Sequence, residues 1–443
     1  MKDFPTVCLC LFFLGGKAFH SLNGEGQGSP YPHKPEAFFP ELAPVLSDLD
    51  EKAPYLLEQR ELVRQAGSQR MIADSSKGFK FGVNTQVQSI HEDRPSQDFH
   101  HRYRTLSSVY LTKPLFHWGA LDAASKVAEL SEKSSKLRHS SLLRSYRTKV
   151  RSDYLDMIIL RYEGELAEVS YGLALENERD LVRRQDLGHV SDLTVYEGTL
   201  ARLKQSIKLS ELRREVYHQS RVFLMETGYS TKLTFAKTLA FTNFCENHPF
   251  SSSLPVLVSQ LSSPEVENLR NEIEVETNKI KIAEADLKPK LNLIGSVYQD
   301  QVALASNRDT LTRNNLVVGV EAKWNFWDSS LSRGKKEAAR SRKRMNELSL
   351  QRSSARLRLA IEDLRNQMVG LEGEINANRQ LVKVAGNRYD KSLIEFRQNR
   401  ITPTLHFESR LTLDESKLDL AKSVSRYLKL RDLYDERTTF TRN

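Results

Sequence analysis

The sequence predicts an α+β protein in which two copies of one structural unit follow each other along the chain. Three observations predict it: an export signal at the start, residue matches at a spacing of about 210 residues, and long stretches with coiled-coil periodicity. Each unit is expected to contain a pair of strands followed by two long antiparallel helices.

Residues 1–18 have the pattern of a signal peptide. Lys2 precedes an apolar run from Val7 to Leu14, and small side chains suited to cleavage follow at Gly16 and Ala18. Removal of this segment leaves Cys245 as the only cysteine, which excludes an intramolecular disulfide.

The stretch after the signal, residues 19–49, is rich in proline and glycine and is expected to be an extended, partly disordered arm. A short helix is expected from about Asp50 to Ala73. No later segment holds about 20 consecutive apolar residues, so no transmembrane helix is expected. An exported chain of this kind is periplasmic, secreted or inserted as a β-barrel.

Composition and charge exclude several function classes. Charged residues make up 28% of the chain and aromatic residues 8%, which suits long helices with solvated faces. The net charge is +9, but basic and acidic residues alternate along the helices, so no nucleic-acid partner is expected. Phosphate-binding glycine loops and hydrolase motifs are absent from the sequence, so we expect neither catalysis nor a cofactor.

The duplication is visible as matched residues in the same order. The pairs are Lys80 and Lys290, Leu106 and Leu316, Lys113 and Lys323, Phe116 and Phe326, and Leu121 and Leu331. After a slip of one residue, Tyr196 and Glu197 match Phe407 and Glu408. Because these matches keep the same order over much of the chain, they indicate an internal repeat.

Alternation of apolar and polar side chains predicts four strands. In the last of them, Leu316, Val318 and Val320 lie on one face, while Glu321 and Lys323 lie on the other. The expected strands are residues 79–90, 103–116, 289–300 and 313–326, with polar loops at 91–102 and 301–312. Each pair therefore predicts a hairpin with one apolar face.

Heptad spacing predicts the long helices. One row with this spacing is Leu350, Leu357, Leu364 and Leu371, and the other is Ile361, Met368, Ile375 and Val382. The expected helices are 119–187 and 191–227 in the first repeat (residues 50–263), and 264–287, 329–398 and 402–437 in the second (264–443). An irregular connector is expected at 228–263. A helix over 119–187 would be roughly 100 Å long and would need partner helices.

Each long helix is expected to end at a tight turn and reverse. Gly188 can adopt the left-handed conformation that closes a helix, and Ser191 or Asp192 can cap the next one. Asn399 takes the place of Gly188 in the second repeat, where Thr402 is the expected cap before Pro403.

From about residue 50 to residue 440, this arrangement resembles the TolC-like outer-membrane factor family. The motifs that carry the resemblance are the junctions 113–119 and 324–328, the start of the third strand at 288–291, and the turns 188–193 and 399–402. Each motif is weak alone, but their order, repeated twice, is specific.

The resemblance implies a homotrimer in the outer membrane of a Gram-negative bacterium. Four strands from each chain would form a twelve-stranded β-barrel in outer-membrane lipid, and the helices would form an α-barrel across the periplasm. The implied function is a passive exit duct for a tripartite efflux or type I secretion system, with a periplasmic adaptor and an inner-membrane pump as partners. Six aromatic residues are candidates for interface girdles: Phe79, Phe81, Tyr103, Tyr110, Trp324 and Trp327.

Two departures from the family pattern are expected. The first helical hairpin looks shortened, and Asn399 stands where the family usually has glycine.

The resemblance also implies a constriction near the second turn, where acidic side chains of three chains converge. The corresponding positions are Leu405 and Glu408, with Glu197 as the equivalent of Glu408 in the first repeat and Arg400 beside the turn. A ring of Glu408 carboxylates would attract cations and help to hold a gate. The alternative interpretation is that Glu408 and Arg400 are ordinary solvated helix and turn residues.

Two other protein classes share some of these features. A periplasmic adaptor also has an export signal and a helical hairpin, but it has a single hairpin rather than two. A structural coiled-coil protein of the cell envelope would not need strand pairs. His91, His100 and His101 gather in the first expected loop, where an exposed polar loop is favoured over a metal site.

Overall fold

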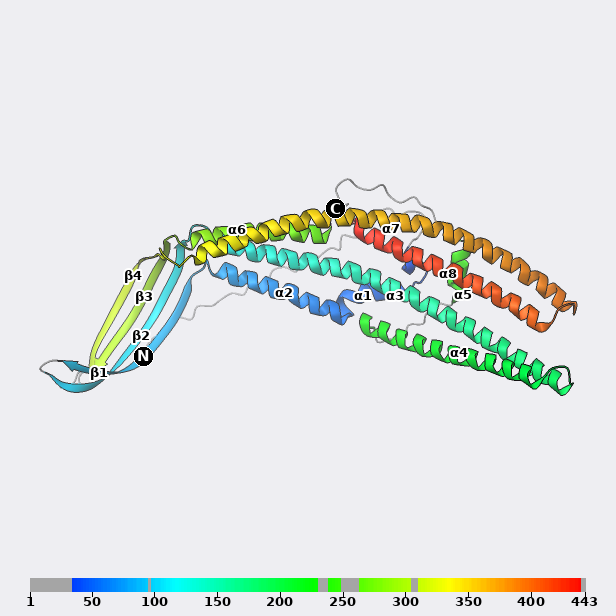
Figure 1. The fold of residues 1–443 in the computed structure, drawn as a ribbon. Helices are drawn as coiled ribbons and strands as arrows, with labels where there is room; N and C mark the ends of the chain where they lie inside the picture. Colours follow the sequence, from blue (N-terminus) through cyan, green and yellow to red (C-terminus); the bar gives the residue numbers. More distant parts are fainter. Residues whose placement is uncertain (1–33, 95–96, 230–237, 248–262, 304–309, 440–443) are drawn as a thin grey trace, which may run out of the picture.

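The computed structural model describes residues 34–94, 97–229, 238–247, 263–303 and 310–439. The chain is elongated, with a four-stranded sheet at one end and long helices that run to two hairpin tips at the other (Figure 1). The expected signal peptide and the arm up to residue 33 lie outside the described residues. Among the described helices, none is both long enough and apolar enough to cross a membrane.

The sheet contains the four expected strands, in the order β1–β2–β3–β4 with antiparallel neighbours. Their bounds are β1 Lys80–Arg94, β2 Gln97–Phe116, β3 Lys290–Ala303 and β4 Thr310–Lys323. The expected loop at 91–102 was wrong, because β1 and β2 stay paired until Arg94 lies opposite Gln97. Backbone pairing does not require apolar side chains, so the polar composition of this segment was misleading. The fourth strand also ends before the expected residue 326.

The two faces of the sheet differ in character. Val83 lies opposite Val109, Val109 opposite Val297, and Val297 opposite Leu316, so one apolar row crosses all four strands. Val83 is 75% exposed and Leu316 73%, so this apolar face is uncovered in the single chain. The other face is polar and carries the pair formed by Arg104 and Asp300, 2.7 Å apart.

Tyr110 lies on the polar face, which corrects its assignment to an aromatic girdle. It is the cross-strand partner of Gly82, whereas Phe81, on the apolar face, is opposite Leu111. The Tyr110 ring covers the glycine so closely that a Cβ atom on Gly82 would lie 2.7 Å from ring carbon Cε1. The glycine therefore provides the space that the tyrosine occupies.

The long helices form a layer whose order follows from their contacts. Their bounds are α2 Pro54–Ser75, α3 Ala120–Asp186, α4 Asp192–Thr227, α6 Pro264–Ala285, α7 Leu331–Arg397 and α8 Pro403–Thr439. Helix α3 packs against α2 and α4 on one side and against α6 and α8 on the other, and α7 packs against α6 and α8 (Figure 1). The layer thus runs from α2 and α4, through α3, α6 and α8, to α7.

The heptad rows predicted for the second repeat are confirmed as packing positions. Ile361, Met368, Ile375 and Val382 are all buried. Helices α3 and α7 contain 67 residues each and helices α2 and α6 contain 22 each, so the first repeat is not shortened relative to the second.

The one-residue slip between the repeats occurs earlier than the sequence matches indicated. Lys80 is equivalent to Lys290, and their cross-strand partners are Thr112 and Lys323. The matches of Lys113 to Lys323 and of Leu106 to Leu316 are therefore wrong by one residue. A shift of one residue turns a strand side chain to the opposite face: Leu106 lies opposite Asp300 on the polar face, and Leu316 opposite Val297 on the apolar face.

The expected extended arm is also corrected in its described part. Pro35–Ala37 forms the 3₁₀ turn η1, and Leu42–Lys52 forms helix α1. Five buried apolar side chains of this segment join the core around Tyr154 and Tyr427: Phe39, Leu42, Val45, Leu46 and Leu49. Their spacing of three and four residues makes an apolar helix face, which the surrounding prolines obscured.

The connector expected at 228–263 is partly helical. Helix α5, Thr238–Asn247, packs against α3 and α8. Its residues Phe241 and Cys245 are buried in the same core as the first helix. Helices α1 and α5 therefore contribute to one core near the middle of the helical layer.

Candidate functional site at the tips of the helical hairpins

The two hairpin tips have the turn geometry that the sequence predicted. Gly188 has φ 75° and Asn399 has φ 55°, so both close their helices in the left-handed conformation. The Ser191 side chain accepts a hydrogen bond from the backbone N–H of Thr194. Thr402 Oγ1 accepts one from the Leu405 N–H at 3.3 Å. The two turns are thus equivalent, and Glu197 and Glu408 lie at the same distance beyond their caps.

The structure places the four candidate gate residues at these tips, but it does not join them into one contact. Glu197, Glu408 and Arg400 are exposed, and none forms an ion pair with the described residues of its own chain. Leu405 is 43% exposed, on the first turn of α8. Within a single chain these side chains are free to meet another molecule.

A cavity of about 490 Å³ lies beside the second tip, between α7 and α8. Its lining joins apolar side chains, among them Ile401 and Leu405, to the basic side chains of Arg388 and Lys391. Leu405 is the only one of the four candidate residues that lines this cavity.

A buried polar cluster that forms part of the wall of this cavity was missed in the sequence. Ser392 Oγ lies 3.1 Å from His406 Nδ1, and the Ser409 hydroxyl donates to the His406 carbonyl oxygen at 2.7 Å. The His406 ring stacks between those of Phe396 and Tyr389, with centroids 5.0 and 5.3 Å away. Ser392 lies on the heptad row of Leu364, and a polar residue in an apolar row was the signal that could have revealed it.

At the first tip, the residues at the positions equivalent to this polar cluster are apolar. Gly198, the equivalent of Ser409, is buried against Leu181, the equivalent of Ser392. A Cβ atom on Gly198 would lie 2.7 Å from Leu181 Cδ1. The two tips therefore share a backbone geometry but differ in chemistry, since only the second has a polar interior.

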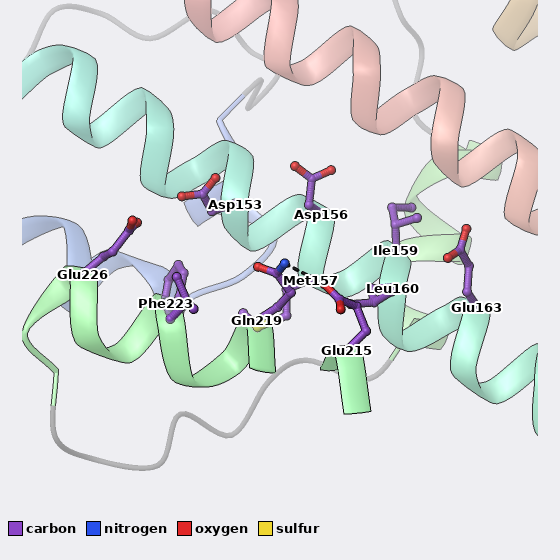
Figure 2. Close-up of a pocket in the computed structure, with 11 residues that line it drawn as sticks. Asp153, Asp156, Met157, Ile159, Leu160, Glu163, Glu215, Gln219, Phe223 and Glu226 are labelled. Atoms are coloured by element: carbon purple, nitrogen blue, oxygen red, sulfur yellow. Dashed lines mark hydrogen bonds between the residues drawn. The ribbon is translucent and has the colours of Figure 1, made fainter. Parts of the chain in front are cut away.

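A second hollow, of about 390 Å³, lies between α3 and α4 (Figure 2). Its lining combines apolar residues such as Phe223 and Met157 with five carboxylates: Asp153, Asp156, Glu163, Glu215 and Glu226.

Most of these carboxylates already have partners. Glu226 pairs with Lys149 at 2.7 Å, Glu163 pairs with Lys422 at 2.7 Å, and Asp156 pairs with Lys429. Burial raises the pKa of the Asp153 carboxyl, and Lys149 opposes this effect. The hollow is thus a charge-balanced seam between two helices rather than an open cation site.

The described residues contain no group of three histidine, cysteine, aspartate or glutamate side chains placed to hold a metal ion. The side chains of His100 and His101, two of the three histidines in the expected loop, lie outside the described residues. Cys245 is buried with its thiol free, and burial raises the pKa of that thiol.

No protein-family model matches the chain, and no curated protein matches it by sequence. Solved structures do match its fold. The CmeC outer membrane channel of Campylobacter jejuni has a TM-score of 0.76 at 11% identity, over 91% of this chain and 86% of that chain. CusC, described in connection with transmembrane channel formation, has a TM-score of 0.69 at 11% identity, over 90% and 92%. The outer membrane protein VceC of Vibrio cholerae has a TM-score of 0.67 at 13% identity, over 90% and 96%.

Proposed function

We propose that this chain, which has the fold of the TolC-like outer-membrane factors, forms a homotrimeric exit duct in the outer membrane of a Gram-negative bacterium. Three sheets would close a twelve-stranded barrel in lipid, and three helical layers would close a hollow α-barrel in the periplasm. The duct would carry solutes or proteins passively, and a periplasmic adaptor and an inner-membrane pump would complete an efflux or type I secretion system.

The observation that carries this proposal is that both layers of the chain end in free edges. Strands β1 and β4 each have one strand neighbour among the described residues. An open sheet with an uncovered apolar face is not stable in water, and open edges are not tolerated in lipid. Pairing between β4 of one chain and β1 of the next removes every edge at once.

The internal repeat predicts how those edges pair. Within the chain, β2 of the first repeat pairs with β3 of the second, and Val109 lies opposite Val297. Strand β4 is the repeat equivalent of β2, and β1 is the repeat equivalent of β3. Strand β4 of one chain should therefore pair with β1 of the next in the same register in which β2 pairs with β3. Val320 of one chain then lies opposite Val87 of the next, with both side chains on the apolar face.

We expect a disulfide to join neighbouring chains when Val87 and Val320 are both replaced by cysteine. Residues opposite each other on antiparallel strands have Cβ atoms about 4.5–5.5 Å apart, close to the spacing that a disulfide needs. Mild oxidation of outer-membrane fractions should give bands of two and three linked chains on denaturing gels, each chain having a mass of 50.8 kDa less that of the removed signal peptide. A link within one chain is excluded because these strands lie at opposite edges of the sheet.

The matched control replaces Val87 and Val317 instead. Val317 neighbours Val318 on β4 but points to the polar face, opposite Ser296, so this pair should remain unlinked. A protein released without detergent as a monomer would contradict the duct and favour an adaptor or an envelope scaffold. Outer-membrane insertion without any Val87–Val320 link would contradict the proposed strand pairing.

We further propose that Glu408 lines the closed periplasmic aperture, with Leu405, Arg400 and the first-repeat equivalent Glu197 around it. Glu408 is exposed and unpaired within the described chain, and threefold assembly would bring three such carboxylates together. Replacing Glu408 with alanine should raise the conductance of the resting channel in planar bilayers and reduce its preference for cations.

The control for this experiment is Glu415→Ala. Glu415 is also exposed and lies on the same helix, two turns farther from the tip. If Glu408→Ala and Glu415→Ala both leave the resting conductance and the cation preference unchanged, then Glu408 is an ordinary solvated helix residue.

A further inference from the structure

The contact between α3 and α8 contains a buried ion pair that bears on how neighbouring chains recognise each other. Arg151 Nη1 lies 3.1 Å from Asp432 Oδ1. The Arg151 side chain is 12% exposed and the Asp432 side chain is 8% exposed. This pair lies where the last helix of the second repeat packs on the long helix of the first.

Because the chain contains an internal repeat, the contact between α3 and α8 has an equivalent between neighbouring chains. Helix α3 is equivalent to α7, and α4 is equivalent to α8, as the helix ends show: Leu187 and Gln398 cap the C-terminal ends of α3 and α7, and Asp192 and Pro403 begin α4 and α8. The equivalent of the contact between α3 and α8 is therefore a contact between α7 of one chain and α4 of the next.

The residues at the equivalent positions carry the opposite charges. Glu362 on α7 corresponds to Arg151, and Arg221 on α4 corresponds to Asp432. Both side chains are exposed in the single chain, and neither forms an ion pair with the described residues. The contact of Arg221 within the chain is with Tyr217, whose hydroxyl lies 3.5 Å from Nη1.

An apolar pair accompanies the charges. The contact of Glu436 on α8 with Thr148 on α3 is polar. The equivalents of these two residues are Met225 and Leu359, which are 68% and 65% exposed in the single chain. Two large apolar side chains at equivalent positions on two free faces are complementary, just as the charges are.

We propose that Arg221 of one chain pairs with Glu362 of the next along a seam between α4 and α7, and that Met225 and Leu359 pack beside them. This inference rests on the proposed homotrimer and specifies its helical interface. The partner that the surface fits is a second copy of this chain.

The charges are reversed between the α3–α8 contact within a chain and the α4–α7 contact between chains. Each helix would therefore fit only its correct partner. If α4 met the α3 position instead of α7, Arg221 would face Arg151. If α8 met α7 of another chain at this level, Asp432 would face Glu362. Both mistakes bring like charges together where water is excluded, and such contacts are strongly unfavourable. The duplicated halves could therefore not exchange places during assembly.

Charge reversal tests the pair. Arg221→Glu and Glu362→Arg should each lower the ratio of trimer to monomer, measured by the mass of detergent-solubilised particles, by about tenfold or more. The variant with both reversals should recover the wild-type ratio to within about twofold, which also shows that the single variants were not simply misfolded. Lys208→Glu is the matched control, because its equivalent in the second repeat, Asp419, is exposed to solvent.

The outcomes separate this inference from the proposed function. A trimer that withstands both single reversals overturns the ion pair but leaves the duct intact. Failure of the double reversal to restore a weakened trimer also overturns the pair. Absence of any wild-type trimer overturns both proposals.

Discussion

Replacing Arg151 with methionine is expected to lower the free energy of unfolding by about 3–5 kcal/mol, because it leaves the buried Asp432 carboxylate without its partner. Arg151 binds Asp432 through Nη1 and Glu36 through Nε and Nη2, at distances between 2.7 and 3.2 Å. Asp432 is too deeply buried for solvent to replace the guanidinium. The shift should be visible as a lower denaturant midpoint in circular dichroism of the purified protein.

Two further variants test whether the loss of stability comes from the unpaired carboxylate. Arg179→Met breaks an exposed pair with Glu176 on the same helix and should cost less than about 1 kcal/mol. Adding Asp432→Leu to Arg151→Met removes the unpaired charge and should recover most of the lost stability. If Arg151→Met costs no more than Arg179→Met, the network contributes little to the stability of the fold.

The network also shows why this part of the fold could not be predicted. Its three members come from η1, α3 and α8, which are far apart in the sequence, and no periodic pattern links them. By contrast, the long helices and the strand pairs follow from local periodicity, which the sequence displays directly. The expected helix at 119–187 was found at Ala120–Asp186, and the one at 329–398 at Leu331–Arg397.

The candidate site was predictable to a similar extent. The turns at Gly188 and Asn399 follow from conformational preferences of single residues, and the structure has both in the left-handed conformation. The His406 cluster depends on three helix positions meeting across a hairpin, so only the unusual polar residues in an apolar row pointed to it. The roles of Glu408 and Glu197 depend on neighbouring chains, and they remain predictions because a single chain does not contain those contacts.

Gly228→Ala is expected to lower the free energy of unfolding by about 3–5 kcal/mol, the sum of backbone strain and steric overlap. Gly228 ends α4 with φ 68°, a conformation that costs other residues about 1–2 kcal/mol. A Cβ atom there would overlap the carbonyl oxygen of Lys52 and lie 2.7 Å from its carbonyl carbon. Backbone cannot rotate away as a side chain can, so the junction of α1 with α2 would have to separate from the end of α4.

Gly188→Ala separates the two causes, because Gly188 has φ 75° but a Cβ atom there would have no neighbour within 4 Å among the described residues. It should therefore show the strain alone, about 1–2 kcal/mol. Equal losses for the two variants would mean that the end of α4 does not depend on close contact with Lys52. A larger loss at Gly228 would identify this contact as the point where the N-terminal helices are fixed to the first hairpin. Those helices cover the middle of the helical layer, so loosening them should also weaken the core around Tyr154 and Phe223.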